Sequence, residues 1–108
     1  MAIFSLTQSE HDSLRNVIDT IEYDLEDIDA RPSGWSETKY IHVFQSVMTK
    51  LRTYSADISL TAEECDLLLT GIVCYIQYAD RFDEEPIPSE IVRQLRELAN
   101  KLKSENPT

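Results

Sequence analysis

The chain has 108 residues and a mass of 12.4 kDa, with 20 acidic and 10 basic residues and a formal net charge of -10. This length fits one domain, and an apolar fraction of 42% supports a folded core. The acidic excess argues against direct nucleic-acid binding, because a phosphate-binding surface needs a basic stripe. With only two Gly and four Pro, the composition also argues against a turn-rich β fold, so we expect an all-α protein.

The sequence shows no pattern for export or for crossing a membrane. Residues 1–7 turn polar before an apolar run develops, so we expect no secretory segment. The longest apolar stretch, residues 67–79, is shorter than the roughly 20 residues that a transmembrane helix needs. Cys65 and Cys74 fall on nearly opposite sides of one predicted helix and cannot pair. We therefore expect a cytoplasmic protein with two free thiols.

Two amphipathic helices are predicted in the first half of the chain. The first begins at a capping box formed by Thr7 and Glu10 and continues to about Ile28. Its apolar stripe consists of Leu14, Val17, Ile18, Ile21, Leu25 and Ile28. After a turn at residues 31–34, the second helix covers residues 36–54. Its predicted core face consists of Ile41, Phe44, Met48 and Leu51.

Two further helices are predicted in the second half. The third begins at another capping box, Thr61 and Glu64, and continues to about Phe82. An acidic link at residues 83–88 leads to the fourth helix. The apolar stripe of the fourth helix consists of Ile91, Leu95, Leu98 and Leu102. Four amphipathic helices joined by short links predict an antiparallel four-helix bundle.

The two halves of the chain resemble each other at an offset of 54 residues. Residues 5–14 and 59–68 agree at six of ten positions, and the same offset places Pro32 on Pro86. Without a gap it also matches the core stripes of the second and fourth helices, placing Ile41, Phe44 and Met48 on Leu95, Leu98 and Leu102. We predict a single domain, residues 1–108, built from two pseudo-repeated αα hairpins at about residues 5–55 and 59–105. The alternative is that capped amphipathic helices resemble each other without a duplication.

Negative charge is concentrated in the first predicted helix. Residues 10–29 hold eight acidic side chains and one basic side chain, Arg15. The acidic edge, the densest part, consists of Glu22, Asp24, Glu26, Asp27 and Asp29. The helix dipole disfavours acidic side chains at the C-terminal end of a helix, so these residues destabilise the helix locally. Because such a cost suggests a functional use, we predict that this edge attracts a basic protein partner by electrostatic steering. The alternative is that the charges set helix pairing and keep the protein soluble.

The third predicted helix is apolar around more than half of its circumference, which exceeds the stripe that a bundle helix needs. Leu69 and Val73 extend one side. The apolar flank on the other side consists of Leu67, Cys74 and Tyr78. We predict that the apolar flank contacts a protein partner or a second copy of the chain. The alternative is that the second and fourth helices and the N-terminal segment cover it.

The sequence lacks the common motifs of catalysis and metal binding. It has no Gly-rich phosphate loop, no His-Glu-x-x-His pair, no Gly-x-Ser-x-Gly turn and no Cys-x-x-Cys pair. His11 and His42 stand alone, so we expect no enzyme, cofactor or metal. The sequence predicts a small protein-binding module of microbial or phage type that occludes a basic partner, as inhibitors, antitoxins and immunity proteins do. The alternative is a homo-oligomeric structural or adaptor module, such as a homodimer through the third helix.

Overall fold

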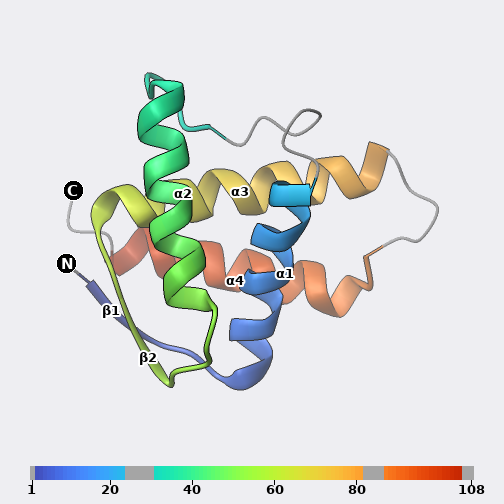
Figure 1. Ribbon diagram of the computed structural model, residues 1–108. Coiled ribbons are helices and arrows are strands. Elements are labelled where there is room, and N and C mark those ends of the chain that lie inside the picture. Colours follow the sequence, from blue (N-terminus) through green and yellow to red (C-terminus); the bar gives the residue numbers. More distant parts are fainter. Residues whose placement is uncertain (1, 24–30, 82–86, 106–108) are drawn as a thin grey trace.

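The computed structural model describes residues 2–23, 31–81 and 87–105. Its elements in chain order are β1 (Ala2–Ser5), α1 (Gln8–Tyr23), α2 (Glu37–Leu51), β2 (Asp57–Leu60), α3 (Ala62–Arg81) and α4 (Ser89–Glu105). Figure 1 shows α3 and α4 passing behind α1 and α2, with the two strands together beside the C-terminal end of α4. The mostly helical fold with four helices is confirmed in this part of the chain. The bundle's antiparallel arrangement stays a prediction, and residues 24–28, the predicted end of the first helix, lie outside the described ranges.

The first helical turns follow the capping signals in the sequence. The Thr7 hydroxyl accepts from the Glu10 amide at 3.1 Å, and the Glu10 carboxylate accepts from the Thr7 amide at 2.9 Å. Thr61 and Glu64 form the same two bonds at 3.1 and 2.9 Å. Ser36 caps α2 through its hydroxyl. Each cap satisfies backbone donors that the first turn leaves without a helical partner, so these three helix starts are confirmed.

β1 and β2 form a two-stranded antiparallel sheet, which corrects the all-α expectation. Phe4 pairs with Ile58, and both side chains are buried, whereas Ile3 on the opposite face is exposed. The Leu6 amide donates to the Ala56 carbonyl at 2.8 Å and extends the pairing by one step. Each strand has only four residues, too few for a period of two to stand out against the helical pattern.

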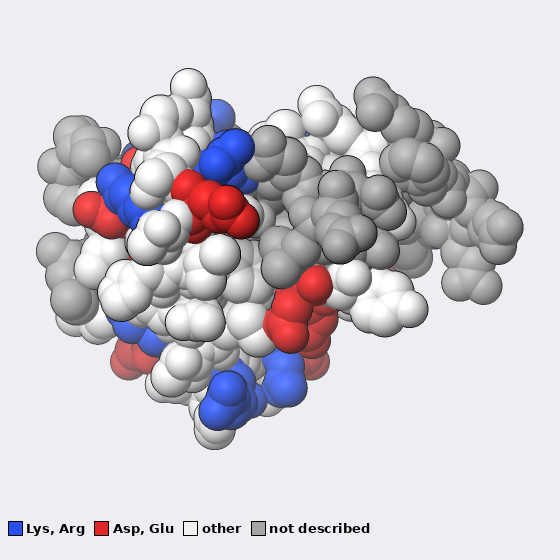
Figure 2. Space-filling model, turned by 45° about the horizontal axis from the view of Figure 1, so that its top comes forward, with Lys and Arg blue, Asp and Glu red and all other residues white. Residues whose placement is uncertain are grey.

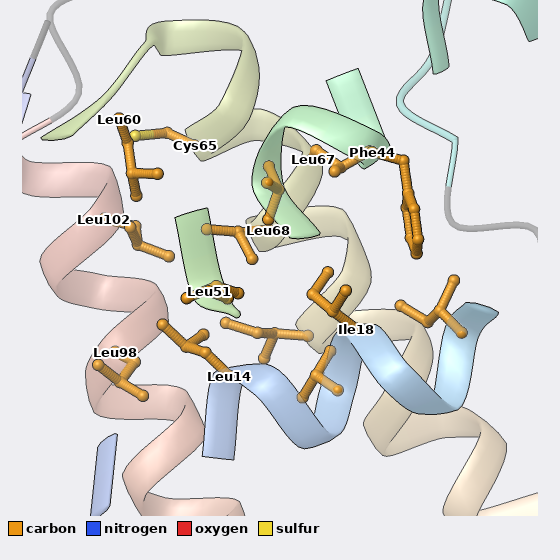
Figure 3. Packing of buried hydrophobic residues seen from close by; sticks show 14 of the residues in the cluster. Leu14, Ile18, Phe44, Leu51, Leu60, Cys65, Leu67, Leu68, Leu98 and Leu102 are labelled. Atoms are coloured by element: carbon orange, nitrogen blue, oxygen red, sulfur yellow. The ribbon is translucent and has the colours of Figure 1, made fainter. Parts of the chain in front are cut away.

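The hydrophobic core receives side chains from all four helices and from the sheet. In Figure 3, Leu14 of α1, Leu51 of α2, Leu68 of α3 and Leu98 of α4 point toward a common centre. The core face of α2 differs from the predicted one, because Ile41 is 47% exposed. Phe44 and Leu51 are buried as predicted, and Met48 is partly buried against the core. The buried face of α2 also includes Tyr40, Val43 and Val47.

The order strand, helix, helix occurs twice among the described elements. Phe4 and Ile58 are 54 residues apart, so they are equivalent positions at the predicted offset. They also pair with each other in the sheet, so the two strands are related symmetrically about this pair. In α2 and α4 the core positions correspond at an offset of 51 instead, pairing Tyr40 with Ile91, Phe44 with Leu95, Val47 with Leu98 and Leu51 with Leu102. The ungapped match of Ile41 with the buried Leu95 is therefore wrong. The duplication itself stays a prediction.

In each half of the chain, a lysine of the second helix binds a carbonyl at the outer edge of one strand. Lys50 Nζ of α2 donates to the Ser59 carbonyl of β2 at 2.7 Å, and Lys101 Nζ of α4 donates to the Ser5 carbonyl of β1. The serines are 54 residues apart and the lysines 51, in agreement with the two offsets. Each lysine reaches the strand of the other half, so these bonds join the halves and occupy edge carbonyls that are otherwise open to another strand.

Candidate functional site

The acidic edge lies mostly outside the described residues. Glu22 is exposed on the last turn of α1, whereas Asp24, Glu26, Asp27 and Asp29 fall in the range 24–30 that the structure does not describe. Earlier on α1, Asp12 and Asp19 are also exposed. The outer face of α1 therefore presents carboxylates along its length.

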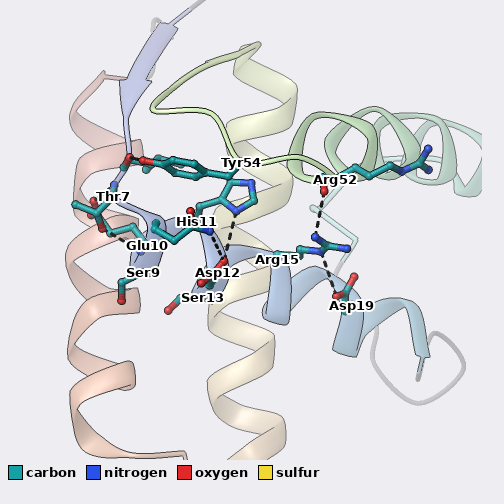
Figure 4. A network of polar contacts seen from close by, with 12 residues as sticks. Thr7, Ser9, Glu10, His11, Asp12, Ser13, Arg15, Asp19, Arg52 and Tyr54 are labelled. Carbon is teal, nitrogen blue, oxygen red and sulfur yellow. Dashed lines mark hydrogen bonds and ion pairs between the residues drawn. The ribbon is translucent and has the colours of Figure 1, made fainter.

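Arg15 is the basic residue of α1, and it faces α2. Its guanidinium donates to the Arg52 carbonyl at 3.1 Å and lies 3.8 Å from the Asp19 carboxylate (Figure 4). The pair with Asp19 is exposed on both sides and contributes at most about 1 kcal/mol. Arg15 thus offsets one carboxylate of α1 at the border with α2.

Acidic and basic side chains are interspersed on the face drawn in Figure 2. They form several small groups separated by uncharged surface. One exposed ion pair joins two helices, with Lys39 Nζ of α2 lying 3.8 Å from the Glu63 carboxylate of α3. On this face the described residues do not form a continuous acidic surface.

The apolar flank is only partly accessible. Leu67 is 1% exposed and belongs to the core, because α2 packs across this part of α3. This corrects the expectation that Leu67 anchors an interface. Cys74 and Tyr78 are half-buried and pack against the core. Among the described side chains of α3, Val73 is a large apolar one that is exposed, with 53% of its surface accessible, and it lies on the other side of the helix.

A groove of about 690 Å³ opens between α1 and the start of α4. Its polar wall comes from α1 and α3 and consists of Gln8, Ser9, Asp12, Ser13, Asn16 and Tyr75. Its apolar wall lies at the start of α4 and consists of Ile87, Pro88 and Ile91. Among these lining residues Asp12 carries the one charge, so the groove favours a cationic group.

Side-chain hydrogen bonds tie the helices together along the polar wall. Gln94 Nε2 of α4 donates to Ser9 Oγ at 3.0 Å, and the Ser13 hydroxyl donates to Gln94 Oε1. Asn16 Nδ2 donates to the Tyr75 hydroxyl at 2.9 Å. Burial raises the pKa of Tyr75, and the bond from Asn16 lowers it only in part. The phenol therefore keeps its proton at neutral pH and can donate a hydrogen bond.

Neither the groove nor the acidic edge contains a cysteine, and the buried thiol of Cys65 is unreactive. Burial and the nearby carboxylates of Asp66 and Glu64 raise the pKa of Cys65 to about 11. At neutral pH the thiol is protonated and is a poor nucleophile.

In residues 2–23, 31–81 and 87–105, no group of three or more His, Cys, Asp or Glu side chains is placed to hold a metal. Within the same ranges, no helix has the length and apolar character to cross a membrane.

The groove was not predicted from the sequence, although the sequence contains a signal for it. At the structural offsets, Ser13 and Gln94 occupy the positions that Leu67 and Val43 hold in the other half. A polar residue in one half whose equivalent in the other half is apolar and buried indicates that the two positions have different roles.

Comparison of the chain with family models, curated proteins and solved structures found no match.

Proposed function

We propose that this protein is a small binding module that occludes a basic surface of a protein partner, in the manner of inhibitors, antitoxins and immunity proteins. The observation that supports this most is the outer face of α1. Asp12, Asp19 and Glu22 are exposed along it, and Arg15 is the one base among the residues of this helix. The acidic edge continues the same charge in the sequence beyond Glu22.

The proposed mechanism is electrostatic attraction followed by steric cover. A net charge of -10 attracts a basic partner over about a Debye length, roughly 8 Å at physiological salt, and raises the rate of encounter. The carboxylates of the acidic edge then pair with lysines or arginines at the partner's surface. Function in this scheme requires only that the module cover that surface, so no catalytic group is needed.

Affinity capture from a lysate of the native host tests this function. The tagged protein is compared with an edge variant, Glu22→Lys/Asp24→Lys/Asp27→Lys, using low-salt and high-salt washes and mass spectrometry. We expect the wild type to retain one basic protein in stoichiometric amount, with binding that is weaker at high salt. The edge variant should not retain this protein.

A matched control separates the position of the charges from net charge. The variant Glu37→Lys/Glu90→Lys/Glu97→Lys reverses three exposed acids on α2 and α4, and so changes the net charge equally. It should retain the partner. Equal capture by all three proteins, or the absence of a basic partner, contradicts the proposal.

A homo-oligomeric module is the second candidate, supported by the surface of α3. Val73 is exposed between Leu69 and Ile76, which are half-buried and one helical turn away on either side. Together they form an apolar strip that a second copy would cover. Analytical ultracentrifugation at several concentrations tests this candidate. A concentration-dependent dimer that Val73→Lys abolishes supports it, and a wild type that stays monomeric excludes it.

A further inference from the structure

The groove between α1 and the start of α4 has a counterpart in the other half of the molecule, which we call closed because its central residues are apolar and buried. At the offsets of 54 and 51 residues, the counterpart lies between α3 and the start of α2. There Leu67 and Val43 are both buried in the core, and Lys39 of α2 reaches Glu63 of α3 at 3.8 Å. Buried apolar side chains and an ion pair therefore occupy the positions that uncharged polar side chains and Glu90 occupy beside the groove.

The open groove replaces that apolar packing with polar groups. Ser13 and Gln94, at the positions of Leu67 and Val43, hydrogen-bond to each other, and Gln94 also binds Ser9. A hydrogen bond stabilises a fold less than the burial of a Leu or Val side chain, because polar groups bond to water in the unfolded chain. The polar arrangement thus stabilises the fold less than the apolar one, so stability alone does not account for it.

We infer that this groove binds an extended segment of the protein partner in which an apolar residue stands next to a lysine or arginine. The inference rests on the proposed function and adds the contact by which the partner is recognised. In an extended segment, neighbouring side chains point in opposite directions. A segment lying along the groove therefore directs one side chain to each wall.

The chemistry of the two walls fixes the two residue types. Ile87, Pro88 and Ile91 offer apolar surface to an aliphatic or aromatic side chain. Across the groove, the exposed Asp12 carboxylate accepts a hydrogen bond from Gln8 at 3.0 Å and attracts an ammonium or guanidinium group. The side-chain amides and hydroxyls of the polar wall match the alternating N–H and C=O groups of an extended backbone.

Selection from a phage-displayed library of random linear peptides of about twelve residues tests the inference. The full-length protein is the bait, and Ser13→Leu/Gln94→Val, which copies the closed counterpart, is the comparison. We expect the wild type to enrich peptides with an apolar residue beside Lys or Arg. A synthetic enriched peptide should bind at least tenfold more weakly to Ser13→Leu/Gln94→Val and to Asp12→Asn.

Two controls keep the test decisive. Asp12 is exposed, so Asp12→Asn tests the charge without disturbing the core even if the double variant fails to fold. Val73→Lys on α3 should bind the peptide like the wild type, because Val73 does not line the groove. No enrichment, enrichment without the residue pair, or equal binding by Asp12→Asn overturns the inference.

The inference and the proposed function fail in different ways. Peptide enrichment without a basic partner in the host lysate contradicts the proposed function and supports a peptide-binding groove. Capture of a basic partner by the wild type and equally by Asp12→Asn and Ser13→Leu/Gln94→Val supports the function and overturns the groove as its contact.

Discussion

Glu64 is a buried carboxylate held by several hydrogen bonds, with only 2% of the residue exposed. It accepts from Lys50 Nζ at 2.6 Å, from the Ser46 hydroxyl at 2.9 Å and from the Thr61 amide at 2.9 Å. Burial raises the pKa of Glu64, but the bonds from Lys50, Thr61 and Ser46 together outweigh it, so the pKa lies below 4.5. The ionised carboxylate is therefore the form that the fold stabilises.

The lowered pKa of Glu64 predicts how stability depends on pH. Its stabilising contribution is fully present above the unfolded value near 4.5 and is lost as the pH falls through the folded value. We expect Glu64→Gln to cost about 1.5–3 kcal/mol at pH 7, because Lys50 loses a charged acceptor. The difference from the wild type should shrink below pH 4.5. Urea unfolding between pH 7 and pH 3 checks this, and a constant difference would show that the carboxylate charge is not involved.

His11 is buried on α1 with its ring edge-on to Tyr54, the centroids 5.3 Å apart (Figure 4). Within the described residues neither ring nitrogen has a hydrogen-bond partner, and the Asp12 carboxylate is 3.8 Å away. An unsatisfied buried polar group costs about 1–3 kcal/mol. We therefore expect His11→Phe, which keeps a ring beside Tyr54, to raise the free energy of unfolding by about 1 kcal/mol. His42→Phe, at an exposed position of α2, should change it by less than about 0.5 kcal/mol.

Chemical denaturation of the two histidine variants separates the effect of the buried site from that of a more apolar sequence. An equal gain in both variants would assign the gain to the more apolar sequence. A loss of stability in His11→Phe would mean that the His11 nitrogens are satisfied in solution.

At the scale of elements, Gly71 sets how closely α3 approaches α1. A Cβ at this position would lie 3.2 Å from Ile21 Cδ1 and 3.8 Å from Val17 Cγ1. Glycine inside a helix lowers stability by about 1 kcal/mol relative to alanine. Closer packing of α3 on α1 offsets this loss. The atom that must give way is the end of a flexible side chain, so alanine is tolerated there with a small shift of Ile21.

A double-mutant cycle tests this contact between α1 and α3. Gly71→Ala alone should change stability by less than about 1 kcal/mol, because the gain in helix propensity opposes the tight contact with Ile21. In an Ile21→Val background, which removes the Cδ1 atom, the same change should be stabilising by about 1 kcal/mol. Thermal unfolding of the four proteins measures the coupling. Additive effects would place α1 and α3 farther apart than the structure does.

The sequence predicted helices better than strands for a physical reason. Capping boxes and apolar steps of three and four are local signals, and the structure forms both boxes and four helices. The pairing of β1 with β2 is a long-range interaction between four-residue segments, which local patterns do not reveal. In α2, apolar steps of three and four residues selected Ile41, which is exposed, whereas packing buries Tyr40 and Val43.

At the scale of the whole molecule, the candidate sites were only partly predictable. Charge is read directly from the sequence, and Glu22 of the predicted acidic edge is exposed on α1. The accessibility of a side chain depends on which helix packs over it, and Leu67 of the predicted apolar flank is buried in the core. The groove depends on residues from α1, α3 and α4 that come together only in the fold. Comparison of the two halves places Ser13 of its polar wall on Leu67 at the offset of 54, and the neighbouring Gln94 on Val43 at the offset of 51.

The central claim is that the acidic edge, which begins at Glu22 of α1, steers a basic partner to this protein. The association rate constant with the captured partner, measured at several salt concentrations, tests it most directly. For the wild type we predict a fast rate that falls steeply with salt. Glu22→Lys/Asp24→Lys/Asp27→Lys should associate more slowly and with a flatter salt dependence, while Glu37→Lys/Glu90→Lys/Glu97→Lys stays closer to the wild type. Equal rates and equal salt slopes for the two variants would contradict the claim, because position on the surface would then have no influence beyond net charge.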